Sequence, residues 1–164
     1  MENINIRPIK KDELHILENL LYEAIFQSEN SASLPFEIIY SPDIYVYIED
    51  WGKSKNDLCL IGEIDGKIVG GVWTRILAGE VKGYGNIDNT TPEFAISLFK
   101  EFRKKGYGTL LMAEMINLLK QKSYKRVSLS VNKENYAARM YKNLGFEVIK
   151  ENEEDLLMVL NLEK

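Results

Sequence analysis

A basic segment that contains two glycines holds the side chains best suited to chemistry in this sequence. It reads Phe102-Arg-Lys-Lys-Gly-Tyr-Gly-Thr-Leu-Leu111, and residues 100–105 carry four cationic side chains and one carboxylate in a chain of net charge −4. Glycines let a backbone approach a ligand closely and turn its N–H groups one way. A helix that starts here adds unpaired N–H donors and the positive end of its dipole. The segment predicts a phosphate-binding loop, or, on the plainer alternative, a solvated helix start after a glycine turn.

Two common nucleotide-binding loops do not match this segment. A Walker A loop needs Lys and then Ser or Thr directly after its last glycine, whereas Thr109 and Leu110 follow Gly108. A dinucleotide fingerprint needs a third glycine where Leu111 stands, and an acid about 20 residues further on, where Ser128 and its neighbours offer none. The remaining pattern is Arg-x-x-Gly-x-Gly between a strand and a helix.

The strands and helices around the segment must position it. Apolar patterning predicts a short strand that ends near Pro8 and strands at 58–64, 67–77, 93–99, 126–131, 146–149 and 156–162. Helical spacing predicts helices at 11–26, 43–51, 106–122 and 135–144. Asp65-Gly66 is typical of a two-residue type I′ hairpin turn. The order of elements predicts an α/β fold, a mixed sheet with helices on its faces, in one domain over residues 1–164.

The composition is that of an ordinary globular chain, with 45% hydrophobic and 28% charged residues. Its acidic balance argues against general nucleic-acid binding and suits a cationic substrate. Cys59 is the only cysteine and lies in an apolar run, so we expect no internal disulfide and a core position. His15 is the only histidine, so the sequence argues against a Ser-His-Asp triad and against a histidine-based metal site. We therefore expect no metal.

The N-terminal residues Met1-Glu-Asn-Ile lack the cationic and apolar regions of a signal peptide. No apolar stretch approaches the roughly 18 residues that a membrane-spanning helix needs. Together with the absence of disulfides, these features favour a reducing, cytoplasmic location and no membrane partner.

A second segment, Asn135-Tyr-Ala-Ala-Arg-Met-Tyr-Lys-Asn-Leu-Gly-Phe146, gives the first one a context. With both segments and its order of elements, the chain resembles the GNAT superfamily of acetyl-coenzyme A-dependent N-acetyltransferases over nearly its whole length. In that family Asn, Ala, Tyr and Gly-Phe recur at this spacing. The resemblance implies a single GNAT-like α/β (α+β) domain. Its central sheet would be mixed, mostly antiparallel, of about seven strands, splayed at the cofactor site, with helices on both faces.

The resemblance implies that acetyl-CoA binds along the basic segment and the strand before it. The pyrophosphate would be held by backbone N–H groups of Arg103, Lys104, Lys105, Gly106, Tyr107, Gly108 and Thr109. The three cationic side chains would also reach phosphate oxygens, or the two lysines would form a solvated basic pair. The backbone of Leu98, with Phe99 beside it, would pair with the pantetheine arm. Asn135 would contact that arm or cap its helix.

Acetyl transfer from a thioester needs a neutral amine and a proton donor for the departing thiolate. The resemblance places Tyr141 near the sulfur, where its phenol would donate that proton; the plainer alternative is a core aromatic. Glu93 opens the strand before the basic segment and is the leading candidate for the base, with Glu80 and Asp88 as alternatives. For each of the three, the plainer alternative is a surface carboxylate with no role in catalysis.

The acceptor is expected against the first helices and their loop. Aromatic and acidic residues gather there and would suit a cationic amine, or they form ordinary packing and a solvated acidic face. They are Phe36, Glu37, Tyr40, Asp43, Tyr45, Tyr47, Glu49, Asp50 and Trp51, with Trp73 and Tyr84 as further candidates.

We expect direct attack by a primary amine in a ternary complex, a small-molecule amine being favoured over a peptide or protein amine. A non-catalytic acyl-CoA-binding or sensing module on the same fold is the alternative. An unrelated phosphate-binding domain would instead prefer ATP or NAD to acetyl-CoA. Homodimers are common in the family, and the resemblance leaves a homodimer open.

Overall fold

One mixed sheet of seven strands forms the frame of the molecule, for which the computed structural model describes residues 3–28 and 32–163. The strands lie in the order β1-β2-β3-β4-β5-β7-β6, and only the neighbours β4 and β5 run parallel. This confirms the predicted α/β class with a mostly antiparallel sheet. The bounds are β1 Asn5–Pro8, β2 Leu58–Ile64, β3 Lys67–Arg75, β4 Glu93–Leu98, β5 Arg126–Asn132, β6 Glu147–Glu151 and β7 Asp155–Asn161.

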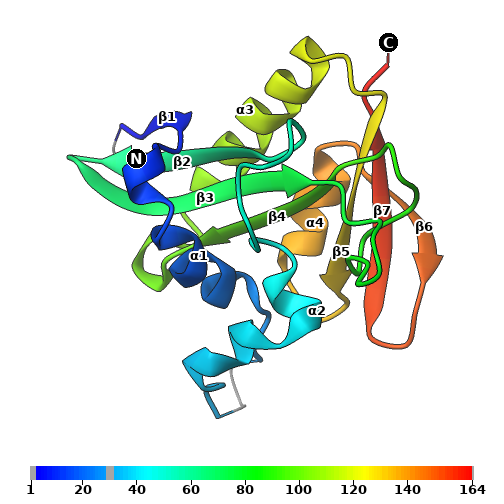
Figure 1. The fold of residues 1–164 in the computed structure, drawn as a ribbon, viewed down its shortest axis with the longest axis horizontal. Helices are drawn as coiled ribbons and strands as arrows, with labels where there is room; N and C mark the ends of the chain where they lie inside the picture. Colours follow the sequence, from blue (N-terminus) through cyan, green and yellow to red (C-terminus); the bar gives the residue numbers. More distant parts are fainter. Residues whose placement is uncertain (1–2, 29–31, 164) are drawn as a thin grey trace.

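Helices cover both faces of this sheet (Figure 1). Helix α1 packs with α2 against one face, which includes Trp73 of β3, whereas α3 and α4 pack against the other, which includes Val72. Adjacent residues of a strand point to opposite faces, so β3 contributes to both layers. The bounds are α1 Ile16–Ala24, α2 Pro42–Tyr45, α3 Tyr107–Gln121 and α4 Ala137–Asn143, with short 3-10 helices at Lys11–Glu13, Phe36–Tyr40 and Lys100–Phe102.

The hairpin between β2 and β3 has the predicted turn. Asp65 and Gly66 both have positive φ, 50° and 79°, as both central residues of a type I′ turn must. The prediction of this hairpin from Asp-Gly is therefore confirmed.

Two predicted helices are shorter than their patterns indicate. In the 11–26 segment, the Glu13 carboxylate accepts hydrogen bonds from the Lys10 N–H and from both terminal nitrogens of Arg7. These bonds tie a separate 3-10 turn to β1 before α1 begins. In the 43–51 segment, Arg75 binds the carbonyl oxygens of Val46 and Glu49 at 3.0 and 2.8 Å. In a longer helix, those carbonyl oxygens would accept hydrogen bonds from N–H groups of the helix itself. Because they accept from Arg75 instead, α2 ends early. No helix within residues 3–28 and 32–163 is long and apolar enough to cross a membrane.

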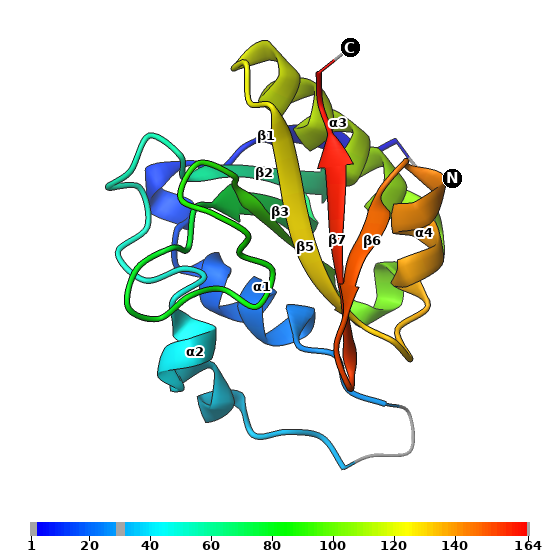
Figure 2. The same cartoon turned by 90° about the vertical axis from the view of Figure 1, so that its right-hand side faces the viewer.

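The sheet divides between β4 and β5. Within the described residues their register contains one pair, Glu93 opposite Ser128, next to a hydrogen bond from the Ser128 N–H to the Pro92 carbonyl. Figure 1 shows the two strands separating toward their arrowheads, and Figure 2 shows β5, β7 and β6 standing at an angle to the remaining strands. The rest of β4 thus has β3 on one edge and a gap on the other.

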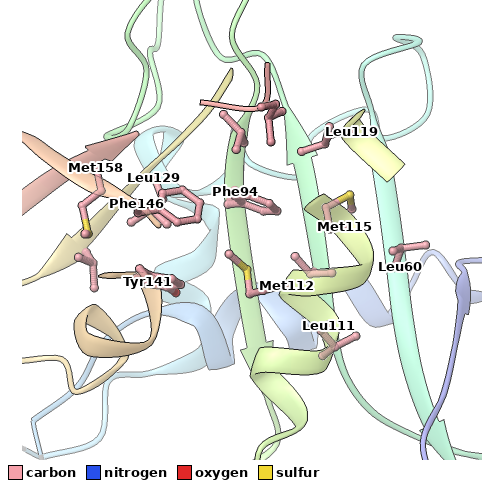
Figure 3. Close-up of a cluster of buried hydrophobic side chains, with 14 residues drawn as sticks. Leu60, Phe94, Leu111, Met112, Met115, Leu119, Leu129, Tyr141, Phe146 and Met158 are labelled. Carbon is pink, nitrogen blue, oxygen red and sulfur yellow. The ribbon is translucent and has the colours of Figure 1, made fainter. Parts of the chain in front are cut away.

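Phe94 fills the closed end of this gap. Figure 3 shows its ring between Met112 and Met115 of α3 on one side and Phe146 on the other. The Phe94 and Phe146 ring centroids are 5.9 Å apart, and Tyr141 of α4 meets Phe146 edge-on at the same distance. This aromatic row fixes Tyr141 relative to β4.

Candidate active site

A large cavity opens where β4 and β5 separate. Its volume is about 930 Å³, which is within the range of ligand-binding pockets. It is bordered by the end of α1 and the residues after it, by β4, by the basic loop and by the start of α4. Of the predicted cofactor-binding residues, it is lined by Leu98, Arg103, Lys104, Gly106, Gly108, Thr109 and Asn135.

The basic loop has a backbone suited to an anion. Lys104 and Gly106 both lie in the left-handed region, with φ of 61° and 92°, and α3 begins directly afterwards at Tyr107. No side chain among the described residues caps this helix start, so its first N–H groups face the cavity without a side-chain partner. Such successive N–H groups form a concave anion site, and the helix dipole adds positive potential.

Gly108 forms part of the cavity wall. A Cβ built on it would meet the Met140 sulfur at 3.6 Å and a Leu98 methyl at 3.7 Å, which are ordinary contacts. The position therefore has room for a methyl group, whereas a large side chain would project into the cavity.

The cationic side chains of the loop have different surroundings. Arg103 donates to the Leu98 carbonyl and to the Glu23 carboxylate, both at 2.9 Å, and so ties the end of α1 to the end of β4. The Lys104 ammonium lies 5.2 Å from the centroid of the Tyr136 ring. Lys105 is exposed and lies outside the cavity lining. The structure thus brings Lys104 to the cavity and commits much of Arg103 to holding the scaffold.

The side chain of Tyr107 points away from the cavity. It is 2% exposed and packs with Ile64 and Val69 beneath the sheet. Only its backbone belongs to the loop, which is the part that the prediction concerned.

The free edge of β4 presents backbone groups to the cavity. The Phe99 N–H donates to the Val69 carbonyl at 3.0 Å. In an antiparallel ladder, residues whose backbone N–H and C=O groups face the partner strand alternate with residues whose groups face away. The backbone groups of Leu98 and Ile96 therefore face the gap. The Leu98 carbonyl accepts a hydrogen bond from Arg103, whereas the Leu98 N–H is left for a ligand. Phe99 lies outside the cavity lining with its N–H already used.

Asn135 and Tyr141 border the cavity from the side of α4. The Asn135 Oδ1 accepts the Ala137 N–H at 2.9 Å, so this residue caps the helix, while its amide nitrogen has no partner in the described part of the chain. Tyr141 is 7% exposed, and burial raises the pKa of its phenol, which keeps the proton in place at neutral pH. The Tyr141 hydroxyl also has no hydrogen bond to a described residue.

A second cavity of about 350 Å³ adjoins the first. The two share Ile96, Asn135, Tyr141 and the segment 24–26 as lining residues. Because Tyr141 borders both, a group bound in one cavity can meet a group bound in the other beside this residue.

Glu93 lines this smaller cavity with a buried carboxylate. Only 3% of the residue is exposed, Oε2 accepts from the Tyr47 hydroxyl and from the Gly85 N–H at 2.9 Å, and Oε1 has no partner among the described residues. Burial raises the pKa of Glu93 to about 7, although both hydrogen bonds act to lower it. A group with such a pKa can take a proton at neutral pH.

Two glycines allow the loop before β4 to cover this carboxylate. A Cβ at Gly83 would lie 2.1 Å from Oε1 of Glu93, and one at Gly85 would lie 2.9 Å from Oε2. A side chain at Gly83 would displace the carboxylate, and one at Gly85 would also meet the backbone of Leu129 and Ser130 at 2.8 Å. The two glycines therefore let the loop enclose Glu93.

The other two candidate bases lie elsewhere. Asp88 accepts the N–H groups of Thr90 and Thr91 at 2.9 and 2.8 Å and pairs with Arg126 at 2.6 Å, and these contacts hold its pKa well below the usual range. Glu80 is exposed, and neither carboxylate lines a cavity described above. Glu93 is thus the one of the three that the fold brings to the cavities.

Of the expected acceptor wall, the structure brings Tyr47 and Tyr84 to the smaller cavity. The Asp43 carboxylate accepts a hydrogen bond from the Tyr84 hydroxyl. Trp73 is a core residue with 1% exposure, and Trp51 lies under the Arg75 guanidinium at 4.9 Å. The remaining members also lie outside the lining: Phe36, Glu37, Tyr40, Tyr45, Glu49 and Asp50.

Ile96 and Asp155 are two of the lining residues that sequence reasoning missed. Ile96 shares the free edge of β4 with Leu98, and the two-residue period of a strand could have identified it. Asp155 lies 62 positions after Glu93, at the start of β7, and no local pattern links it to the cavity.

Three solved structures illustrate proteins with the same fold. The ribosomal-protein-S18-alanine N-acetyltransferase from Escherichia coli aligns with a TM-score of 0.67 at 16% identity, covering 99% of this chain and 96% of that chain. The PaiA N-acetyltransferase from Thermoplasma acidophilum, solved with coenzyme A, aligns at 0.67 and 20% identity, with 97% and 99% covered. YncA from Salmonella typhimurium, solved with acetyl-CoA, aligns at 0.67 and 16% identity, with 99% and 96% covered. No curated protein matches the sequence.

The sequence itself decides the family. Residues 22–146 match the pattern of the acetyltransferase (GNAT) family. That range takes in the divided strand pair, the basic loop and α4, and so it includes both segments on which the resemblance rested. This chain therefore belongs to the acetyltransferase (GNAT) family.

Proposed function

We propose that this protein transfers an acetyl group from acetyl-CoA to a small primary amine by direct attack in a ternary complex. The observation that carries the proposal is the junction of two cavities of opposite character at the gap between β4 and β5. The larger has cationic side chains and free N–H groups, which suit a polyphosphate. The smaller has a buried carboxylate with a pKa of about 7, which suits an amine.

The residues of the larger cavity fit acetyl-CoA. The αL residues Lys104 and Gly106 and the uncapped start of α3 would hold its phosphates through backbone N–H groups. The N–H of Leu98 would pair with its amide-bearing arm as an added strand does. When bound, acetyl-CoA supplies the acetyl group as a thioester.

Two side chains would move protons at the junction. Glu93, directly or through a water, would accept the proton of the amine so that its lone pair can attack. Tyr141 keeps its own proton because burial raises its pKa, and its hydroxyl would donate to the sulfur as the thiolate leaves.

A covalent acyl-enzyme on the only cysteine is a poor alternative. Cys59 is buried in the layer of α1, burial raises its thiol pKa to about 12, and it lines neither cavity. A thiol must ionise to act as a nucleophile, so direct attack by the amine is the route that the geometry supports.

The size of the smaller cavity supports a small acceptor. Its volume of about 350 Å³ is near the lower end for ligand pockets, and apolar side chains of α1, α2 and β5 surround it. A small amine can enter such a space whole, whereas a folded protein could insert only one side chain.

A panel of amines with acetyl-CoA, read by release of free thiol, tests the proposal. We expect amine-dependent thiol release and an acetylated amine by mass spectrometry. Calorimetric titration with coenzyme A, ATP and NAD gives the control for the larger cavity, and we expect coenzyme A to bind best. Coenzyme A binding without turnover of any amine would favour a non-catalytic acyl-CoA module, and a preference for ATP or NAD would remove the proposal altogether.

A further inference from the structure

The smaller cavity contains a carboxylate that the acetyl-transfer mechanism does not use. Asp155 opens β7 opposite Asn132 of β5 and lines the cavity with a half-buried side chain. Its backbone carbonyl accepts the Asn152 N–H at 2.8 Å, but its carboxylate has no hydrogen bond or ion pair with any residue that the structure describes. A half-buried carboxylate at a cavity wall, without a partner among the described residues, is available to a cation from outside the chain.

The nearby cations of the protein do not serve this carboxylate. Lys133 follows β5 directly, but its ammonium pairs with Glu151 at 2.7 Å. No Lys or Arg occurs among the described residues that line the smaller cavity, whereas Lys100, Arg103 and Lys104 line the larger one. Among the described residues, the smaller cavity is therefore lined by two carboxyl groups, Glu93 and Asp155, and by no cationic side chain.

These two carboxylates lie at different depths. Glu93 is opposite Ser128 and Asp155 is opposite Asn132, which are four residues apart on β5. At the rise of a strand, their backbone levels differ by about 13 Å. Glu93 is buried with Oε1 unpartnered, and Asp155 is half-buried, so one carboxylate serves the reacting end and the other the outer end.

Two tyrosines line the same cavity as these carboxylates. Tyr47 donates to Glu93, and Tyr84 donates to Asp43. The bond to Asp43 is the main cause that raises the pKa of the Tyr84 phenol to about 12, burial adds to it, and the charge of Asp155 contributes a smaller part. Ring faces attract ammonium groups, and aliphatic side chains such as Leu21, Ile44 and Val131 also line the cavity. The cavity thus has the layout of a site for an alkyl chain with a cation at each end.

Resting on the proposed function, we propose that the acceptor is an amine with a second cationic group, and that Asp155 binds this second cation at the outer end of the cavity. Asp155 is then a specificity-determining residue that takes no part in the proton transfers. A charged hydrogen bond of this kind corresponds to a preference of about ten- to hundredfold over a neutral end group.

Three acceptors of equal length test this: n-butylamine, the diaminobutane with an ammonium at its far end, and the aminobutanoate with a carboxylate there, each repeated with longer chains. We expect kcat/KM in the order diamine, monoamine, amino acid. Asp155→Asn should lower kcat/KM for the diamine about ten- to hundredfold and leave the monoamine within about twofold. Glu153→Gln is the matched control, because it removes the same charge from an exposed position two residues away that does not line the cavity.

Asp155→Lys gives an outcome that misfolding cannot mimic, since we expect it to favour the aminobutanoate over the diamine. Equal turnover of monoamine and diamine by the unmodified protein, or an equal loss with both in Asp155→Asn, would overturn the inference while leaving the acetyltransferase proposal standing. Failure to acetylate any amine would overturn both.

Discussion

The carboxyl group of Glu93 owes its properties to its surroundings. Burial raises its pKa to about 7, and the hydrogen bonds from Tyr47 and Gly85 keep it from rising further. The resemblance indicated Tyr141 by its place in the Asn135–Phe146 segment, and Glu93 by its place at the start of the strand before the basic segment. It did not predict Tyr47 as the partner of Glu93, because 46 positions separate them and only the fold brings them together.

Glu93→Gln should lower kcat about a hundredfold or more, the usual contribution of a general base, because an amide cannot accept the proton. The dissociation constant of coenzyme A should stay within about twofold, since Glu93 does not line the larger cavity. Initial rates and calorimetry measure these two quantities. Full activity in this variant would assign the base to another group.

Tyr47→Phe should move the acidic limb of the pH–rate profile to higher pH. The Tyr47 hydroxyl bond lowers the Glu93 pKa, so its removal lets burial raise that pKa above about 7. The profile of kcat/KM for one amine, measured for both proteins between about pH 5 and 9, gives the two midpoints. An unchanged midpoint together with reduced kcat would mean that Tyr47 acts in some other way.

At the scale of elements, the loop between β4 and α3 is the part that the sequence described best. Its glycines and lysines are local features, and local features determine αL positions such as Lys104 and Gly106. The extent of α2 could not be read in this way, because Arg75, on a strand that follows later, takes its carbonyls. The single β4–β5 pair was expected only through the family, since strand divergence has no signature in the residues themselves.

Gly108→Trp should abolish coenzyme A binding, whereas Gly108→Ala should retain it within about fivefold. The methyl group of alanine meets its neighbours at 3.6 Å or more, but an indole would fill the cavity. Calorimetric titration of both variants, with thermal unfolding as the check on folding, separates the two effects. Binding by the Trp variant with unaltered affinity would contradict the placement of the phosphates.

At the scale of the whole molecule, the two faces of the divided sheet hold the site together. The cluster with Phe94 and Tyr141 lies on the face of α3 and α4 (Figure 3). The Arg103–Glu23 pair attaches α1 on the other face. The overall class of the fold could be predicted because each strand and helix has its own periodicity. The pair of carboxyl groups in the smaller cavity could not be predicted from the sequence. Glu93 lies on β4 and Asp155 on β7, and these strands are connected only through β5, which lies between them.

The buried Glu93 should make the free energy of unfolding fall as pH rises. The folded protein keeps this proton up to about pH 7, whereas the unfolded chain releases it near the ordinary pKa of 4.5. The stabilisation is thus complete below pH 4.5 and lost as pH rises to 7, by about 3 kcal/mol. Urea unfolding at several pH values should show that Glu93→Gln lacks this part of the pH dependence. Identical pH dependence in both proteins would contradict the raised pKa.

The central claim is that donor and acceptor meet in two adjoining cavities beside Tyr141. Initial rates of thiol release, with acetyl-CoA and amine both varied, test it most directly in the unmodified protein and in Tyr141→Phe. We predict intersecting double-reciprocal lines, as a ternary complex requires, and a kcat at least about tenfold lower in Tyr141→Phe with unchanged coenzyme A binding. Parallel lines, or an undiminished kcat in Tyr141→Phe, would contradict the account.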